Sequence, residues 1–121
     1  MEPVLHNLQL VLLQKNPDNI CWGDLIAFRC ERLSDVLVKR VIAVPDDTAV
    51  IQNGHLYVDG NLSSVIPFDV MIKYAGLMTE PICLLEGQYL VLGDNIEYSV
   101  DSRYESVGVV SQESIIGKIL H

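Results

Sequence analysis

Short runs of Val, Ile and Leu alternate with turn-forming Gly, Asp, Asn and Pro along most of the chain. Runs of this length and composition are typical of β-strands. Asn53-Gly54 separates two such runs and predicts a type I′ hairpin turn. Asp59-Gly60 predicts a second tight turn, after which the chain leaves the hairpin. The expected strands are residues 8–13, 25–29, 33–44, 48–52, 55–58, 88–92, 107–110 and 114–120.

The pattern predicts a mostly β fold with little helix. Many closely spaced turns between β-branched runs favour strongly coiled antiparallel sheets that form an open barrel. Residues 70–77 are expected to be a short helix or an irregular connection, and residues 111–114 could form one helical turn. The 121 residues contain no repeat or linker, so we expect one domain over residues 1–121.

Composition narrows the functional classes. Only 20% of the residues are charged and 50% are hydrophobic, so we expect apolar surface that faces a partner, a substrate or a membrane. The net charge of −8 argues against nucleic acid as a partner and against electrostatic attachment to anionic lipid. Within these residues no apolar run is long enough to span a membrane.

The chain carries no recognisable metal motif. Cys21, Cys30 and Cys83 include no Cys-x-x-Cys pair, and the histidines are scattered, so neither a metal nor a cofactor is expected. Cys21 and Cys30 could form a disulfide if they lie on neighbouring strands. We favour the alternative that the three thiols are free and buried.

Lys39-Arg40 interrupts an otherwise apolar strand, residues 36–44. Burying a charged lysine is costly, so the pKa of Lys39 should fall, as a lysine general base requires. The residue alone also fits a structural role, because a lysine on an edge strand prevents aggregation.

A polar segment, Gly93 to Arg103, follows the apolar strand of residues 89–92. It places acids, an arginine and two hydroxyls within eleven residues, too many polar groups for a simple turn. We interpret it as a supported functional site. The structural alternative is that Asp101–Arg103 is an ordinary ion pair and Ser102 a turn hydroxyl.

Ordered blocks along the whole chain resemble bacterial type I signal peptidase, the Ser–Lys membrane peptidase that removes signal peptides from secreted preproteins. In the first two thirds the matching blocks are Met1-Glu2-Pro3 and residues 23–28, 39–47 and 53–60. In the last third they are residues 93–103 and Ile116-Gly117-Lys118. Any one block is weak, but their order and spacing together are specific.

The resemblance implies a role for each matching residue. Lys39 would be the general base and Ser99 would orient its amine. The residues implied to support this pair are Arg40, Gly93, Asp94, Asn95, Asp101, Ser102 and Arg103. The residues implied to bind substrate are Met1, Pro3 and the edge strand Val36, Leu37 and Val38, which would pair with an extended peptide.

The family's substrates are signal peptides cut after Ala-x-Ala sites. The resemblance also implies a location at the extracytoplasmic face of the cell membrane, held there by an amino-terminal anchor, and no cofactor. Without that anchor we expect a soluble domain.

The resemblance has departures. The family's nucleophilic serine falls immediately before Met1, and a second oxyanion-hole hydroxyl two residues further upstream, so residues 1–121 alone are expected to be inactive. Neither Ser99 nor Ser102 stands at the attack position. Ala43 and Asp46 replace glycines, and Asp46 puts the local turn in question because Asp tolerates positive φ less readily than Gly.

Two alternatives remain open at this point. The chain could be a non-catalytic peptide-binding module of the same fold, although binding alone does not need Lys39. It could instead be a self-cleaving Ser–Lys domain of the repressor type. The Gly93 to Arg103 segment is not expected in such a domain, and no DNA-binding region is present in these residues.

Overall fold

The computed structural model describes residues 12–15 and 19–120. The expected substrate-binding residues Met1 and Pro3, and most of the expected strand 8–13, lie outside the described residues.

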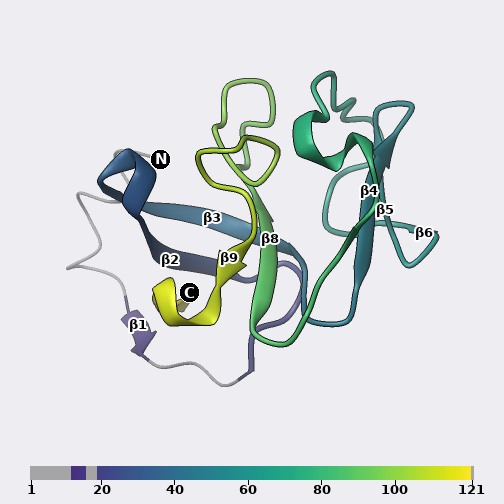
Figure 1. The fold of residues 1–121 in the computed structure, drawn as a ribbon. Coiled ribbons are helices and arrows are strands. Elements are labelled where there is room, and N and C mark those ends of the chain that lie inside the picture. The colour runs from purple at the N-terminus through teal and green to yellow at the C-terminus, as the bar shows by residue number, and fades with distance from the viewer. Residues whose placement is uncertain (1–11, 16–18, 121) are drawn as a thin grey trace.

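A six-stranded antiparallel sheet forms the larger part of the fold (Figure 1). Its order is β1-β10-β2-β3-β8-β9, so strands distant in sequence are neighbours in the sheet. The strands are β1 (Leu12–Lys15), β10 (Ile115–Leu120), β2 (Leu25–Cys30), β3 (Asp35–Ala43), β8 (Gln88–Leu92) and β9 (Val110–Ser111).

A second antiparallel sheet of four strands stands beside β8, on the right of Figure 1. Its order is β6-β5-β4-β7, and its strands are β6 (Asn61–Leu62), β5 (His55–Val58), β4 (Thr48–Gln52) and β7 (Ile82–Cys83). The helical elements described are three 3₁₀ turns, η2 (Glu31–Leu33), η3 (Gly76–Thr79) and η4 (Gln112–Ser114). The prediction of a mostly β fold built from antiparallel sheets is therefore confirmed.

The main apolar core joins the two sheets. Ile42 and Leu90 from the larger sheet pack with Ile51 and Leu56 from the smaller one, and all four are at most 5% exposed. A second cluster, which includes Phe28, Val41 and Val91, covers the opposite face of the larger sheet. The alternation of inward and outward side chains in each strand supplies both clusters.

Turn residues account for the predicted hairpin. Asn53 and Gly54 both have positive φ, 51° and 81°, as a type I′ turn requires, and β4 pairs with β5. Asp59 and Gly60 repeat this conformation, and the chain then pairs again as β6. The expectation that the chain leaves the hairpin there was wrong, because the second turn folds it straight back onto β5.

Two strand boundaries differ from the sequence prediction. The strand expected from residue 33 begins at Asp35, because Ser34 adopts a left-handed φ of 51° that ends η2. The strand expected at 107–110 is reduced to β9, and β7 was not predicted because two residues carry no alternating pattern. The helical turn expected near residues 111–114 is present as η4.

Asp46 retains the left-handed backbone that its position requires, with φ 75°. The cysteines are free, as favoured, but only Cys30 is buried, while Cys21 and Cys83 are exposed. The expectation that all three are buried was wrong because Cys21 and Cys83 lie in a turn and in a short strand at the surface.

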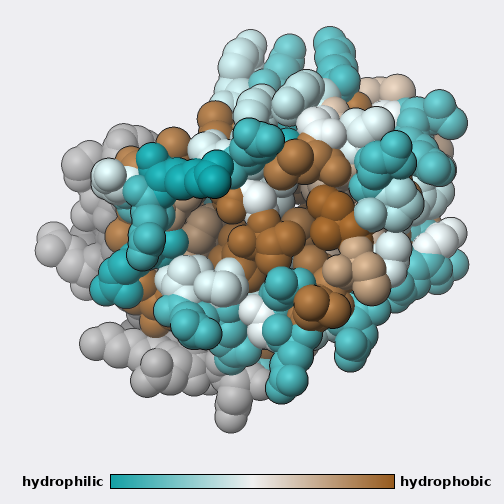
Figure 2. All heavy atoms as spheres, in the orientation of Figure 1, coloured by the Kyte–Doolittle hydropathy of each residue, from teal (hydrophilic) through white to brown (hydrophobic). Residues whose placement is uncertain are grey.

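Large apolar side chains are exposed, as the composition predicted. Phe68, Leu85 and Tyr98 are 70%, 64% and 78% exposed. Figure 2 shows apolar residues gathered in the centre of one face of the molecule, in the region of β8. Among the residues that the structure describes, no helix is long and apolar enough to cross a membrane.

Candidate functional site

Lys39 lies in the middle of β3, opposite Ile26 of β2. Its side chain is buried with the residue only 5% exposed, and Nζ donates a hydrogen bond of 2.9 Å to Ser99 Oγ. The fold therefore brings together the predicted pair of Lys39, on β3, and Ser99, in the segment after β8, although the two residues are sixty positions apart in sequence.

The surroundings of Lys39 favour the neutral amine. Burial lowers the pKa of Lys39 from its ordinary value of 10.5, as the sequence predicted. The negative charge of Asp101 opposes this shift of the pKa, the positive charge of Arg103 reinforces it, and Asp94 opposes it more weakly. A lysine with a lowered pKa supplies more neutral amine at a given pH, which a general base needs.

Gly93 sets how closely Ser99 can approach Lys39. A Cβ at residue 93 would overlap both Ser99 Oγ and Ser99 Cβ and would lie 3.4 Å from Lys39 Nζ. The need for glycine at this position is one of close approach rather than of positive φ. The first residue of the Gly93 to Arg103 segment therefore makes room for the pair.

Asp101 and Arg103 form a buried ion pair that stabilises the Gly93 to Arg103 segment. Both are buried, at 0% and 2% exposure, and Arg103 Nε donates to Asp101 Oδ1 at 2.8 Å. Asp101 Oδ2 also accepts from Gly93 N–H at 3.1 Å, so the carboxylate fixes the residue that contacts Ser99. This ion pair is connected directly to the Lys39–Ser99 pair.

The Arg103 guanidinium is satisfied by three backbone carbonyls as well as by Asp101. It donates to Ile96 O at 2.8 Å, to Ser99 O at 3.2 Å and to Tyr74 O at 3.1 Å. Because a planar guanidinium offers five donors in a fixed arrangement, it can hold two separate loops at once. Sequence reasoning missed Tyr74 and Ile96, because backbone acceptors leave no mark on the side-chain pattern.

Ser102 is structural in geometry. Its Oγ accepts a hydrogen bond of 2.8 Å from Val91 N–H, and its own N–H donates to Val91 O at 3.1 Å. With 0% exposure, this serine ties the segment to β8 and presents no hydroxyl to a substrate. This agrees with the interpretation of Ser102 as a turn hydroxyl.

Arg40 and Asp94 form a two-pronged ion pair on the opposite side of β3 from Lys39. Arg40 Nε and Nη2 donate to the two Asp94 oxygens at 2.8 and 2.9 Å, and Nη1 donates to Gly23 O at 2.7 Å. The hydrogen bond from Arg40 lowers the pKa of Asp94, and Asp94 raises the pKa of Arg40. Asn95 lies exposed in the adjoining turn, where its carbonyl accepts from Tyr98 N–H at 3.1 Å.

The first half of β3 has a free side. β8 pairs with β3 only from Arg40 onward, so in the part of the chain described no strand pairs with residues 35–39 on that side. Val41 directs its backbone groups toward the β2 side, through bonds of 2.8 Å to Asp24 and Gly23. Because backbone groups alternate along a strand, Val36 and Val38 direct theirs toward the free side.

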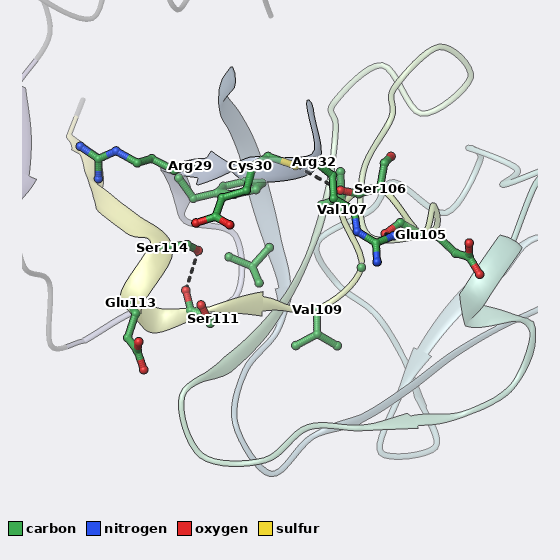
Figure 3. A pocket seen from close by; sticks show the side chains of 14 residues that line it. Arg29, Cys30, Arg32, Glu105, Ser106, Val107, Val109, Ser111, Glu113 and Ser114 are labelled. Carbon is green, nitrogen blue, oxygen red and sulfur yellow. Dashed lines mark hydrogen bonds between the residues drawn. The ribbon is translucent and has the colours of Figure 1, made fainter. Parts of the chain in front are cut away.

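The cavity drawn in Figure 3 does not contain this chemistry. It has a volume of about 710 Å³ and lies between η2 and residues 105–114, with Arg29, Arg32 and Glu105 at its edge (Figure 3). Neither Lys39 nor Ser99 lines it. Within residues 12–15 and 19–120, no group of three or more His, Cys, Asp or Glu is placed to hold a metal ion.

Comparison with known proteins gives one consistent result. The family model described as "Signal peptidase, peptidase S26" matches residues 1–121. The probable signal peptidase I-2 of a Synechocystis species is 28% identical over 129 residues, covering 98% of this chain and 56% of that protein. Signal peptidase IB of Staphylococcus aureus is 31% identical over 112 residues, covering 80% of this chain and 57% of that protein.

A solved structure also matches. The crystal structure of a signal peptidase I from Enterococcus faecalis aligns with a TM-score of 0.64 and 27% identity, covering 86% of this chain and 98% of that one. The chain thus covers almost all of that solved structure, but little more than half the length of the two curated relatives.

Proposed function

This chain belongs to the signal peptidase family, peptidase S26, and we propose that it carries the catalytic domain of a peptidase that removes signal peptides from secreted preproteins. The observation that carries the proposal is the buried Lys39 amine, held 2.9 Å from Ser99 Oγ and lowered in pKa by burial. The nucleophile is the serine that the resemblance places immediately before Met1.

The proposed chemistry uses the neutral Lys39 amine as general base. It takes the proton from the serine hydroxyl while the serine oxygen bonds to the scissile carbonyl carbon. The resulting lysine ammonium then gives its proton to the leaving nitrogen as the C–N bond breaks. In the second half, Lys39 accepts a proton from water, which attacks the ester, and returns that proton to the serine oxygen.

Ser99 is the positioning residue in this scheme. Its Oγ accepts from Lys39 Nζ and fixes the amine without adding a charge beside it. Ser99 is itself a poor candidate for the nucleophile, because it is only 9% exposed and its hydroxyl packs against Gly93. This steric argument is independent of the family resemblance.

The free side of β3 is the proposed substrate-binding edge. The backbone groups of Val36 and Val38 can pair with an extended peptide whose scissile bond lies next to Lys39. In an extended peptide every second side chain points to the same face, so shallow contacts on that face select small residues at alternate positions. This accounts for an Ala-x-Ala preference. Such a peptidase works at the extracytoplasmic face of the cell membrane, where signal peptides emerge.

The test compares two polypeptides, residues 1–121 alone and the same residues preceded by the serine and a short upstream segment. Each is assayed in detergent against an Ala-x-Ala signal-peptide substrate, and the cut is located by mass spectrometry. We expect cleavage only when the serine is present. Lys39→Ala should then lower kcat by about a thousandfold or more, as removing a member of a catalytic group does.

Lys73→Ala is the control, because Lys73 is exposed and contacts neither Ser99 nor Lys39. Equal loss in both lysine variants, or cleavage that survives Lys39→Ala, contradicts the proposal. A folded protein that binds the substrate but never cuts it, with the serine in place, would identify a peptide-binding module instead.

A further inference from the structure

A small apolar cavity lies on the Arg40 face of β3, opposite Lys39, and is bordered by Gly93, the residue against which Ser99 packs. Its volume is about 130 Å³, and its walls include Arg40, Ile42 and Leu92 from the larger sheet and Ile66 and Val70 from the connection after β6. An engineered apolar cavity of about 150 Å³ accommodates benzene. This cavity is therefore large enough for one medium-sized apolar side chain.

The cavity lies where a peptide bound along β3 must leave that strand. From Arg40 onward the edge of β3 is occupied, because Arg40 pairs with Leu92 of β8. A peptide paired with residues 36–38 cannot continue along β3 without displacing β8. Its part beyond the scissile bond must therefore turn away next to Gly93 and Asp94, which also line the cavity.

Strand alternation places the cavity on a defined face. Val36, Val38 and Arg40 project to the same face of β3, because residues two apart share a face, and Lys39 projects to the other. The two alanines of the Ala-x-Ala site are two residues apart, so both side chains can pack on the Val38 face. The second residue after the cut is two residues beyond the last alanine, so its side chain is the next one directed to that face.

The charges at the cavity select against a charged side chain. Arg40 and Asp94 are bound to each other through two hydrogen bonds of 2.8 and 2.9 Å, so neither has a free charge to offer a ligand. Arg40 also donates to Gly23 O. The remaining walls are aliphatic or proline side chains. An ionised side chain would lose its water there without gaining a partner.

We propose that this cavity is the subsite for the second residue after the scissile bond, and that it favours Val, Leu or Ile at that position. The inference rests on the proposed function and extends it to the released side of the substrate. It assigns specificity to the residues that line the cavity, among them Ile42, Val70 and Leu92, which lie outside the Lys39–Ser99 pair.

The first experiment measures kcat/KM for peptides that differ only in the second residue after the cut, using the protein with its upstream serine. We expect Val and Leu to be cleaved at least about fivefold faster than Gly, and Asp or Lys to be the slowest. The same substitutions at the first residue after the cut serve as the substrate control. Rates within twofold of one another across the second-residue series would overturn the inference.

The second experiment fills the cavity. Val70→Phe should reduce the Leu-to-Gly ratio of kcat/KM to about one, because the new ring occupies the space of the substrate side chain. Val50→Phe is the matched control, since Val50 is a half-buried valine of β4 that does not line the cavity. An unchanged Leu-to-Gly ratio of kcat/KM in Val70→Phe contradicts the assignment of this cavity as the subsite. A general loss of activity lowers kcat/KM for both peptides and leaves their ratio unchanged.

Failure of the proposed peptidase activity can be distinguished from failure of the subsite assignment. If no peptide is cleaved, that function fails, and the subsite is judged by methyl NMR on Ile42, Val70 and Ile96 with uncleaved peptides. Shifts produced by the Leu peptide and not by the Gly peptide would support a subsite without catalysis. No difference between the two peptides would overturn it.

Discussion

The space at Gly93 determines whether the Lys39 amine can be held in place. Lys39 is a costly residue to bury, and only Ser99 Oγ, 2.9 Å away, accepts a hydrogen bond from its amine among the contacts described. That hydroxyl reaches the amine because residue 93 has no Cβ. The site therefore depends on one missing methyl group as much as on its charged residues.

Replacing Gly93 with alanine should therefore separate Ser99 from Lys39. We expect Gly93→Ala to lower kcat at least about a hundredfold, as a misplacement of about 1 Å can, and to cost about 1–3 kcal/mol of unfolding free energy as an overpacked site. Peptide cleavage and urea unfolding measure the two effects. Gly60→Ala provides the control, because it strains a positive φ of 83° but meets no atom within 4 Å. Equal kcat in the two variants would show that the Gly93 contact is unimportant.

Asp46 offers a prediction about stability alone. Its φ of 75° is one that glycine adopts without cost, and no hydrogen bond of its side chain is described. Asp46→Gly should raise the unfolding free energy by about 0.5–1 kcal/mol, measured by denaturant unfolding. Asp46→Ala also removes the carboxylate but keeps the strain, so it should give no gain. A similar gain in both variants would assign the effect to charge.

At the residue scale the sequence predicted which side chains lie together: the polar segment after a buried strand is a local pattern, and the family resemblance implied its pairing with Lys39. Lys39, Ser99, Asp101 and Arg103 are brought together as expected. The sequence did not reveal the backbone carbonyls that accept hydrogen bonds from Arg103, those of Tyr74, Ile96 and Ser99. Every residue has a carbonyl, so only the folded path of the chain selects these three.

At the scale of elements, β3 combines an interior strand with an edge strand. Its second half is paired on both sides, whereas residues 35–39 pair only with β2. The change occurs at Arg40, next to the buried lysine. A strand of this kind can present free backbone groups to a peptide without exposing a whole edge to aggregation.

Proline substitutions test which backbone groups face outward. Leu37→Pro removes an N–H that alternation directs toward β2 and should cost about 3 kcal/mol or more. Val36→Pro removes an N–H that bonds only to the side chain of its neighbour Asp35, so it should cost at least about 2 kcal/mol less. Thermal unfolding compares the two variants. Equal destabilisation would contradict the proposed orientation of the edge.

Elements with strong local signals were predicted and those fixed by distant contacts were not. The hairpin of β4 and β5 follows from Asn53-Gly54, a residue pair that strongly favours the positive φ of a type I′ turn. β7 has only two residues and exists because Thr48 and Ala49 pair with it. Ser34 ended the helical turn before β3 through a left-handed φ that its residue type does not predict.

At the scale of the whole molecule, Arg103 joins regions that are far apart in sequence. Its guanidinium binds Tyr74 O, and its own carbonyl accepts from Leu77 N–H at 2.8 Å, so the connection after β6 is held from both directions. The same side chain is paired with Asp101, which holds Gly93. Stability and the geometry of the candidate site therefore depend on the same buried ion pair.

Breaking that pair on one side should be severe. Arg103→Met leaves Asp101 buried without its cation and should cost about 3–5 kcal/mol. Adding Asp101→Leu removes the uncompensated charge, so the double variant should cost less than the sum of the two single variants. Equilibrium unfolding of the four proteins gives the coupling. Strict additivity would mean that the two side chains act independently.

The lowered pKa of Lys39 also predicts how the protein responds to pH. Between the folded-state pKa and 10.5, the unfolded chain binds more protons than the folded chain at Lys39. The contribution of this residue to stability therefore rises with pH across that window and is constant below it. Cleavage should rise with pH over the range in which the folded amine loses its proton.

The most direct test of Lys39 as the proposed general base is an NMR titration of its side chain, with the signal assigned by its loss in Lys39→Met. We expect a midpoint below 10.5 in the folded protein and a return toward that value when the chain is unfolded in denaturant, because burial is the main cause of the lowered pKa. A midpoint at or above 10.5 would contradict the claim that burial in this fold lowers the pKa of the Lys39 amine.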